Sequence, residues 1–248
     1  MNCIQVMGFN VYNDSLEYIN QKKKSIVINT ISPNSYGISS KDKYFKQALI
    51  NSDYLVLDGV YFALASIIIN KKGIKKNQGL DVFYHFMKKI NSENGKIFFL
   101  GSSNQNLKKI SKRSFFEYPK IKINTYSPPF KQELDDNDNL IILDLINEFR
   151  PDVLFVGMTC PKQEKWVYKN KSKINAKYIV CIGAVFDWYA GSEKKISPIW
   201  WKLNLGWLIR TINRPEILRR YPNIGIFFLH LFFAVIGIKK YRNGNIQN

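Results

Sequence analysis

The sequence lacks the features that define several large classes of protein. Its three cysteines, Cys3, Cys160 and Cys181, are too few and too scattered for a disulfide framework or a zinc site, so we expect a reduced, cytoplasmic protein. It contains no uncharged apolar run of about eighteen residues or more, so no transmembrane helix is predicted. Residues 1–20 lack a basic segment followed by an apolar run, so we expect no secretory signal.

The common nucleotide-binding motifs are absent too. Neither Gly-x-Gly-x-x-Gly nor the Walker A lysine motif occurs, so dinucleotide-binding and P-loop folds lack their anchors. No Asp-x-Asp ends a predicted strand, so nothing indicates a metal-bridged nucleotide site, and we expect neither a metal nor another cofactor. His85 and His230 lie in apolar helical segments and are expected to be structural, while Asp135, Asp136 and Asp138 lie on a polar stretch and are expected to be solvated.

What the sequence does have is a large excess of positive charge. Its 248 residues include 37 lysines and arginines against 19 acidic residues, a net charge of +18, and a field of that sign attracts nucleic acid, nucleotide phosphates or an anionic membrane. Half of the excess lies in residues 194–248, where ten basic residues accompany one acid, Glu216. Hydrophobic residues make up 46% of the chain and aromatic residues 15%, which excludes an intrinsically disordered protein.

Short apolar runs alternate with helical-period segments through residues 1–193. The runs are β-branched or aromatic and are bounded by Gly, Pro or Asn, as buried strands are. This alternation predicts an α/β domain with a Rossmann-like, mostly parallel sheet flanked by helices. The predicted strands are Ile26–Asn29, Tyr54–Leu57, Lys96–Leu100, Ile121–Tyr126, Val153–Val156 and Tyr178–Ile182. The predicted helices are Lys41–Asn51, Val60–Asn70, Leu80–Ile90, Asn104–Tyr118, Asn137–Phe149 and Lys162–Asn170.

Residues 194–248 are predicted to form a basic, aromatic helical appendage to that domain. A tryptophan-rich stretch, Pro198–Leu208, is followed by four arginines within Arg210–Tyr221. Ile224–Ile238 is then an uncharged apolar run of fifteen residues, closed by three cations. The run is too short to span a membrane, but its cationic and aromatic flanks suit a segment that lies in the membrane interface. An ordinary buried C-terminal helix is the alternative.

Small or polar residues follow the predicted strands. In open α/β sheets, ligands bind beyond the carboxyl ends of the strands. Gly101, Gly157 and Gly183 open turns at this edge, where backbone N–H groups at a helix N-terminus can bind phosphate, so a phosphorylated ligand is predicted. Asp58 directly follows a predicted strand and precedes a glycine. A carboxylate there acts either as a base, at a cost in desolvation, or as the N-cap of the next helix.

The residues at these strand ends resemble those of the WecG/TagA/CpsF family of glycosyltransferases. The matching segments keep the family's order and approximate spacing from residue 3 to about residue 230, and the ordered set is highly specific although no single segment is diagnostic. The segments are Asn29-Thr30 with Pro33-Asn34, Asp58-Gly59, Gly79–Asp81, Phe99–Gly101, Ser127–Phe130, Arg150–Asp152, Val156-Gly157, Pro161–Glu164, Gly183-Ala184 with Phe186-Asp187, Ala190-Gly191, Pro198 with Trp200, Trp207-Leu208 with Arg210, Pro215, and Arg220-Tyr221.

The resemblance implies a reaction and a place for it. Members of the family transfer N-acetylmannosamine, its uronic acid or a related sugar from a UDP donor. The acceptor is typically N-acetylglucosamine on an undecaprenyl diphosphate carrier at the cytoplasmic face of the membrane, where teichoic acid linkage units, enterobacterial common antigen or capsule are made. The family inverts anomeric configuration and is thought to need no metal. The resemblance also implies a C-terminal appendage that associates with the membrane and closes the active site, and a tendency to form homo-oligomers.

The resemblance also assigns roles to individual residues. Asp58 matches the family's candidate general base, which takes the proton of the acceptor hydroxyl as that oxygen attacks the anomeric carbon. Thr30 and Asn34 match positions that line the sugar pocket, and Gln163 matches the polar residue of the Pro-x-Gln-Glu turn near the same centre. By this resemblance, the candidate catalytic residues are Asp58, Thr30 and Gln163.

The nucleotide diphosphate would be held by backbone and by arginines. The glycines at the ends of the predicted strands, named above, would let the backbone approach the nucleotide. Arg210, Arg214 and Arg220 fall in the appendage where the family places arginines near the diphosphate. Without a metal, the negative charge that develops on UDP needs such cations or helix N-termini, and a bidentate arginine suits a diphosphate better than a lysine does.

The sequence departs from the family pattern at four places. Lys76 stands where the family usually has an arginine, and a lysine cannot fork onto two oxygens, so the donor sugar or its affinity is open. Leu57 precedes the candidate base where many members have proline. Asn204–Trp207 lacks the acid of the family's Gly-Leu-Glu-Trp, and Arg214 replaces the acid that usually precedes the later proline.

Two other readings of the sequence stay open. A nucleic-acid-binding protein would account for the charge, but we find neither surface aromatics interleaved with basic residues nor a recognisable module, so no nucleic-acid partner is expected. A catalytically inactive relative that acts as a membrane-surface scaffold is the other reading. The presence of Asp58 and Gln163 disfavours it, and Lys76 keeps it open.

Overall fold

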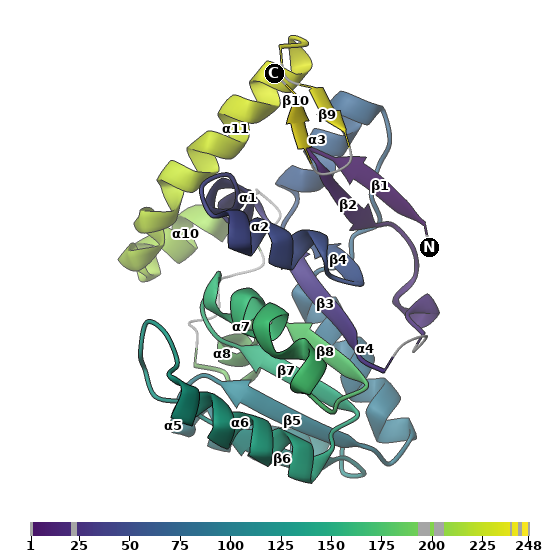
Figure 1. Cartoon of the computed structure of the whole chain (residues 1–248), viewed down its shortest axis with the longest axis vertical. Helices are drawn as coiled ribbons and strands as arrows, with labels where there is room; N and C mark the ends of the chain where they lie inside the picture. Colours follow the sequence, from purple (N-terminus) through teal and green to yellow (C-terminus); the bar gives the residue numbers. More distant parts are fainter. Residues whose placement is uncertain are drawn as a thin grey trace.

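A parallel sheet of six strands forms the centre of the computed structural model, which describes residues 2–20, 24–192, 199–200, 206–238, 240–242 and 245–247. The strand order is β4-β3-β8-β7-β5-β6, and every neighbouring pair is parallel (Figure 1). The predicted fold class is therefore confirmed. The strands are β3 (Ile26–Ile31), β4 (Tyr54–Leu57), β5 (Lys96–Gly101), β6 (Lys122–Tyr126), β7 (Val153–Gly157) and β8 (Tyr178–Cys181).

Helices cover both faces of this sheet. On one face, α4, α5 and α8 pack onto side chains of the strands, and on the other face α6 and α7 do so. The helices α1, α2 and α3 form a further apolar cluster with the ends of β3 and β4. The bounds are α1 (Pro33–Ser39), α2 (Lys43–Ile50), α3 (Tyr61–Asn70), α4 (Gly79–Ser92), α5 (Asn104–Glu117), α6 (Asp136–Phe149), α7 (Lys162–Asn170) and α8 (Val185–Tyr189).

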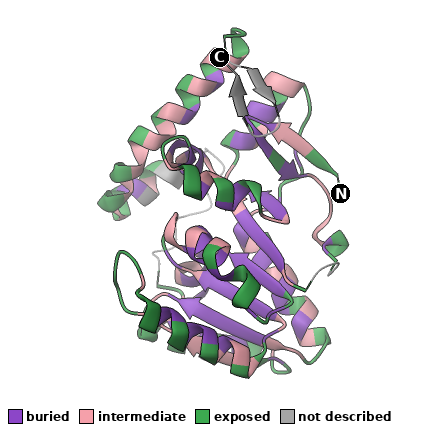
Figure 2. Ribbon diagram, in the orientation of Figure 1, coloured by how far each residue is buried: buried purple, intermediate pink, exposed green. Residues whose placement is uncertain are grey.

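The strands are apolar on both faces because both faces are covered. Every residue of β4 and β8 is buried, and so are the first four residues of β3 and of β7. Continuous apolar runs of this kind are typical of parallel sheets. Figure 2 shows the result, with the buried colour concentrated on the central strands and the exposed colour on the outer helices. Because these buried strands are parallel, their carboxyl ends all lie at one edge of the sheet.

Several short elements were not predicted from the sequence. A hairpin of β1 (Cys3–Val6) and β2 (Phe9–Tyr12) packs beside β4, and η1 (Leu16–Tyr18) follows it. The helices α1 and α8 are seven and five residues long. The start of α1 is fixed locally, because Ser32 and Ser35 form a reciprocal capping box.

The C-terminal part contains α10 (Gly206–Asn213), η3 (Pro215–Arg220), α11 (Tyr221–Val235) and a hairpin of β9 (Lys240–Arg242) and β10 (Asn245–Gln247). Most of the predicted tryptophan-rich stretch lies outside the described residues. Helix α11 packs along α1 and buries Phe227 and Leu231 in the same apolar cluster as Tyr36 and Phe62. The boundary at residue 194 stays a prediction, but α11 shares its core with the N-terminal half of the chain.

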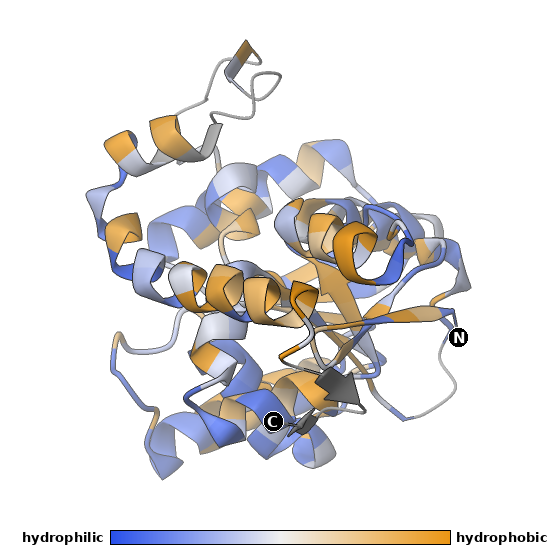
Figure 3. Ribbon diagram, turned by 90° about the horizontal axis from the view of Figure 1, so that it is seen from above, coloured by the Kyte–Doolittle hydropathy of each residue, from blue (hydrophilic) through white to orange (hydrophobic). Residues whose placement is uncertain are grey.

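Helix α11 is buried on one side and exposed on the other, and its place in a membrane interface stays a prediction. One side is buried, whereas Phe228, Phe232 and Val235 on α11 are 42–57% exposed. Helix α3 lies next to it, with the rings of Tyr61 and Phe228 5.6 Å apart. Figure 3 shows the hydrophobic colour along the helix that leads toward the C-terminus. Among the residues that the structure describes, no helix is both long enough and apolar enough to cross a membrane.

The contact between α1 and α11 depends on Gly37. A Cβ atom added there would overlap the backbone carbonyl of Asn223 in α11. Because backbone cannot yield as a side chain can, we expect Gly37→Ala to lower the free energy of unfolding by roughly 1–3 kcal/mol and to raise deuterium uptake in Tyr221–Val235.

Gly225→Ala is the matched control, because its added methyl group meets no atom within 4 Å in the described structure. Alanine favours a helix over glycine by up to about 1 kcal/mol, so this variant should be at least as stable as the parent. Equal deuterium uptake in α11 for the two variants would contradict the packing described above.

Candidate active site

The ends of β3 and β4 bring three predicted site residues to one edge of the sheet. The backbone N–H of Asp58 donates to the carbonyl of Ile31 at 2.8 Å, which places Asp58 beside the end of β3. Its side chain is exposed, so the cost of desolvation expected for a base at this position is not found. The other expectation, that Asp58 caps the next helix, is wrong, because the N-cap of α3 is Val60, two residues later. Asp58 is thus an exposed carboxylate at the carboxyl edge.

Thr30 and Asn34 lie at the same edge and contact other elements. A Cβ atom at Gly79, the first residue of α4, would lie 3.7 Å from Cγ2 of Thr30, so the start of α4 packs against the end of β3. Lys76 is exposed in the loop that leads to this helix. Asn34, the second residue of α1, accepts a hydrogen bond from Nδ2 of Asn223 at 3.2 Å. The helix α11 therefore reaches a residue of the predicted sugar pocket.

The turn from β7 to α7 supplies the buried polar part of the site. Gln163 is only 3% exposed, and its Oε1 accepts the backbone N–H of Gly183 at 3.2 Å. Its Nε2 donates to Oε1 of Glu164 at 2.8 Å. Gly183, at the end of β8, has φ +47. The predicted residues Gln163 and Gly183 are therefore in direct contact. The acid that holds the other end of the Gln163 amide, Glu164, is buried, and no sequence signal indicated its burial.

Electrostatic interactions link this turn to Asp58 and to the C-terminal segment. Burial raises the pKa of the Cys160 thiol well above its usual value, and the charges of Glu164 and Asp58 raise it further. The charge of Arg220, at the N-terminus of α11, opposes the rise. These interactions place Asp58, Glu164 and Arg220 within electrostatic range of one turn. Cys160 therefore stays a neutral thiol at pH 7.

Gly101 and Gly157 lie at the point where the strand connections diverge. β5 continues through α5 to β6 on one side, and β7 continues through α7 to β8 on the other. Such a switch point is the usual ligand crevice of an open α/β sheet. The two glycines are paired in register, and a Cβ at Gly101 would lie 2.6 Å from the Gly157 carbonyl oxygen. A Cβ at Gly157 would overlap the ring of Phe186, so close packing already requires glycine at both positions.

A polar cluster near this switch point joins the main domain to the C-terminal segment. Asp187 in α8 accepts from Nδ2 of Asn106 at 2.9 Å, and Arg214 Nη1 lies 3.6 Å from the other carboxylate oxygen. Arg214 also pairs with Glu216 at 2.7 Å. The side chain of Arg210 lies outside the described residues. Asn106 and Asp187 were not predicted as site residues, although both follow a predicted strand within a few positions.

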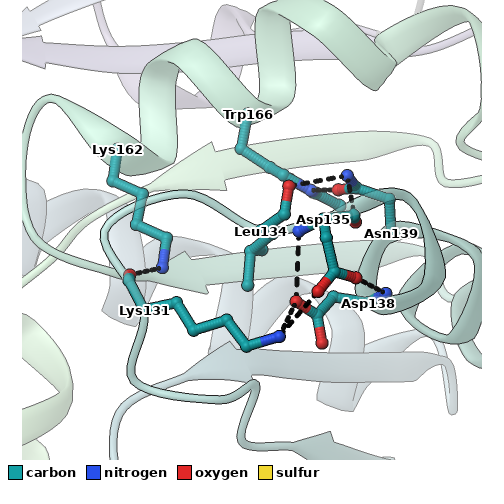
Figure 4. Close-up of polar contacts among 7 residues, drawn as sticks. All are labelled: Lys131, Leu134, Asp135, Asp138, Asn139, Lys162 and Trp166. Carbon is teal, nitrogen blue, oxygen red and sulfur yellow. Dashed lines mark hydrogen bonds and ion pairs between the residues drawn. The ribbon is translucent and has the colours of Figure 1, made fainter.

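The loop between β6 and α6 is held against α7 by a second network (Figure 4). Lys131 Nζ pairs with Asp135 at 2.7 Å and with Asp138 at 2.9 Å, and its carbonyl accepts from Lys162 Nζ at 2.6 Å. Asp138 is 6% exposed, so the expectation that it would be solvated is wrong. The reason is the capping box that it forms with Asp135 at the start of α6.

Within the described ranges, no three His, Cys, Asp or Glu side chains lie close enough together to hold a metal ion. His230 contacts the hydroxyl of Tyr36 at 3.0 Å, in the structural role expected of it.

The fold and the site thus define an α/β protein with a candidate active site at the carboxyl edge of its parallel sheet, facing a basic C-terminal segment.

Comparison with known proteins gives the family. The model of the glycosyl transferase WecG/TagA/CpsF family matches residues 4–241, so the chain belongs to this family of glycosyltransferases. The N-acetylglucosaminyldiphosphoundecaprenol N-acetyl-beta-D-mannosaminyltransferase of Bacillus subtilis (strain 168) is 29% identical over 208 residues, which cover 84% of this chain and 78% of that protein. The protein of the same name from Staphylococcus aureus (strain MRSA252) is 25% identical over 230 residues, which cover 93% and 89%.

The ion pair of Arg214 with Asp187 predicts how the C-terminal segment is attached. Asp187→Asn keeps an acceptor for Asn106 but removes the charge that attracts Arg214. Because partly exposed pairs contribute about 0.2–1 kcal/mol, we expect deuterium uptake in residues 214–220 to rise, by no more than about fivefold. Glu216→Gln, which removes only the local pair of Arg214, is the control, and an equal effect of both variants would argue against the attachment.

Proposed function

We propose that the protein is an inverting glycosyltransferase that moves N-acetylmannosamine or a related sugar from a UDP donor to N-acetylglucosamine on undecaprenyl diphosphate. The names of the relatives from B. subtilis and S. aureus support the acceptor and the sugar. The observation that carries the mechanism is the position of Asp58, an exposed carboxylate at the carboxyl edge of the sheet and in electrostatic range of the turn that Arg220 also reaches.

In the proposed reaction Asp58 is the general base. It takes the proton from the acceptor hydroxyl while that oxygen bonds to the anomeric carbon, and the bond from this carbon to the UDP oxygen breaks. One displacement of this kind inverts the anomeric configuration. An exposed carboxylate is open to an acceptor hydroxyl, and a positioned base contributes roughly 10²–10⁴-fold to the rate.

The charge that leaves with UDP is proposed to be neutralised by the chain itself. Arg214 and Arg220 are half-buried on the segment that packs over the sheet edge, and arginine binds a diphosphate through two parallel N–H donors. Gly101 and Gly157 lie at the switch point of the sheet, where nucleotides bind in open α/β folds. On this proposal no metal ion is needed to balance the developing charge.

The lipid carrier of the acceptor implies a membrane surface. We propose that the protein lies on the inner face of the cell membrane as a peripheral protein. The exposed apolar residues of α11 and the neighbouring exposed residues Leu64 and Ile67 of α3 support this position, because apolar faces of this kind bury themselves in the membrane interface. The net charge of +18 adds attraction to anionic lipid.

UDP release measures the proposed reaction directly. The full-length protein is incubated in EDTA with a short-chain lipid-diphosphate N-acetylglucosamine and, in turn, each of a panel of UDP-sugars. Acceptor-dependent release with one donor would support the reaction and identify the sugar. No release with any donor, from folded protein, would favour the inactive relative that Lys76 leaves open.

Asp58→Asn removes the base and keeps the size of the side chain. We expect turnover to fall by at least roughly 10²-fold, with UDP binding retained in a calorimetric titration. Asp144→Asn is the matched control, because Asp144 is exposed in the middle of α6 and should turn over normally. Near-normal turnover of Asp58→Asn would remove Asp58 as the base.

Phe228→Ser combined with Phe232→Ser tests the membrane surface on α11. Both side chains are exposed, at 42% and 57%, so we expect weaker co-sedimentation with anionic vesicles, most clearly at high salt where attraction between charges is screened. The control is Phe115→Ser with Phe116→Ser on α5, an exposed pair of the same type. Equal losses in the two double variants would contradict a specific role of α11.

A further inference from the structure

A buried acid that the proposed reaction does not use directly lies beside the candidate active site. Glu164, in the first turn of α7, is 2% exposed. Its Oε1 accepts from Gln163, and its Oε2 accepts no hydrogen bond from the described residues. A buried carboxylate with one unpartnered oxygen is costly, and within the described residues no ion pair joins Glu164 to a cation. The cost of burying Glu164 indicates that this side chain has a function.

The geometry around Gln163 indicates what that function is. An amide side chain can turn over, exchanging its oxygen and nitrogen, whereas an ionised carboxylate can only accept hydrogen bonds. Glu164 therefore requires the NH₂ group of Gln163 on its side, and the backbone N–H of Gly183 requires the carbonyl oxygen on the other. Both ends of the amide are thus fixed, and one N–H of Nε2 has no acceptor among the described residues.

We propose that Glu164 is a positioning residue for Gln163, which it holds so that the amide presents an N–H donor, and not a carbonyl, to an oxygen of the bound sugar. The proposal rests on the proposed function for the identity of that ligand. A fixed donor of this kind stabilises charge in the transition state without reorganisation. A neutral acid at position 164 could itself donate, so it would leave only the N–H of Gly183 to fix the orientation of the Gln163 amide.

The protonation of Glu164 gives this arrangement a pH dependence. Burial raises the pKa of Glu164 to about 7, against opposing contributions from Gln163, from the backbone and from the Cys160 thiol. The titratable groups around Glu164 are the thiols of Cys160 and Cys181, whose pKa values burial raises. The charge of Asp58 raises the pKa of Cys160 further, and the charge of Arg220 lowers it. Both thiols stay neutral near pH 7, so the change in charge there belongs to Glu164.

The proposal predicts opposite effects of pH on activity and on stability. Activity should fall as pH drops through about 7, because the protonated acid no longer fixes the amide. Stability should change the other way: the folded pKa lies above the unfolded value of 4.5, so folding takes up a proton, and the stabilisation is lost as pH rises through about 7. Glu164→Gln should remove both dependences.

Kinetics of Glu164→Gln test the positioning role. We expect kcat for UDP release to fall by about tenfold or more, since misplacement of a catalytic group by ~1 Å costs up to ~10²-fold, with KM little changed and the acid limb of the pH profile absent. The melting temperature should equal or exceed that of the parent at pH 8. In a double-mutant cycle with Gln163→Ala, the second change should add almost nothing. Full additivity, or an acid limb that persists in Glu164→Gln, would overturn the proposal.

A spectroscopic test is independent of the enzyme's substrates. The chain has eight glutamines, so ¹⁵N-glutamine labelling gives few side-chain NH₂ signals, and Gln163→Ala identifies the one from Gln163. We expect this signal to titrate with a midpoint near 7 in the parent and not in Glu164→Gln. A signal that does not titrate in the parent would overturn the positioning role even if UDP release is normal. Absence of UDP release with any donor, beside a normal titration, would instead count against the proposed function alone.

Discussion

The parallel pairing of the six strands is the constraint on which the rest of this molecule depends. Because all strands run the same way, each of them ends at the same edge, and the residues that follow them are brought together although they are far apart in the sequence. Asp58 follows one strand, Gln163 follows another by six positions, and Gly183 lies two residues beyond the end of a third. Pairing in this form also buries both faces of the sheet, so a ligand can reach the strands only at their ends.

The C-terminal helix belongs to this arrangement more closely than an appendage would. It buries Phe227 among the aromatic rings of Tyr36 and Phe62, and Asn223 contacts Asn34 at the sheet edge. The close approach at Gly37 joins the two backbones directly. One face of α11 thus completes the N-terminal core, while its other face exposes apolar side chains beside α3. A change in the position of this helix would therefore change the contacts of Asn34 at the candidate site.

The sequence predicted the strands and long helices well because their apolar periodicity is strong. The bounds of β4 and α7 agree to the residue. The helix α1 could not be predicted in this way, since serines, a proline and Gly37 give it little intrinsic propensity, and packing against α11 stabilises it. At the site, position at a strand end indicated Asp58. Nothing in the local pattern indicated that its side chain is exposed while Glu164 is buried, because burial depends on which elements pack over the edge.

The buried acid illustrates why a site can be hard to infer from its residue types. A glutamine at position 164 would fill the same space and could bond Gln163 in either orientation, so it would specify neither. A carboxylate specifies one orientation because it has no donor, but it must be held in an apolar place. The first turn of α7 reduces the cost, since backbone N–H groups at a helix N-terminus favour negative charge. The remaining cost is offset by the apolar core on both faces of the sheet, so this fold can hold a buried ionisable group beside its carboxyl edge.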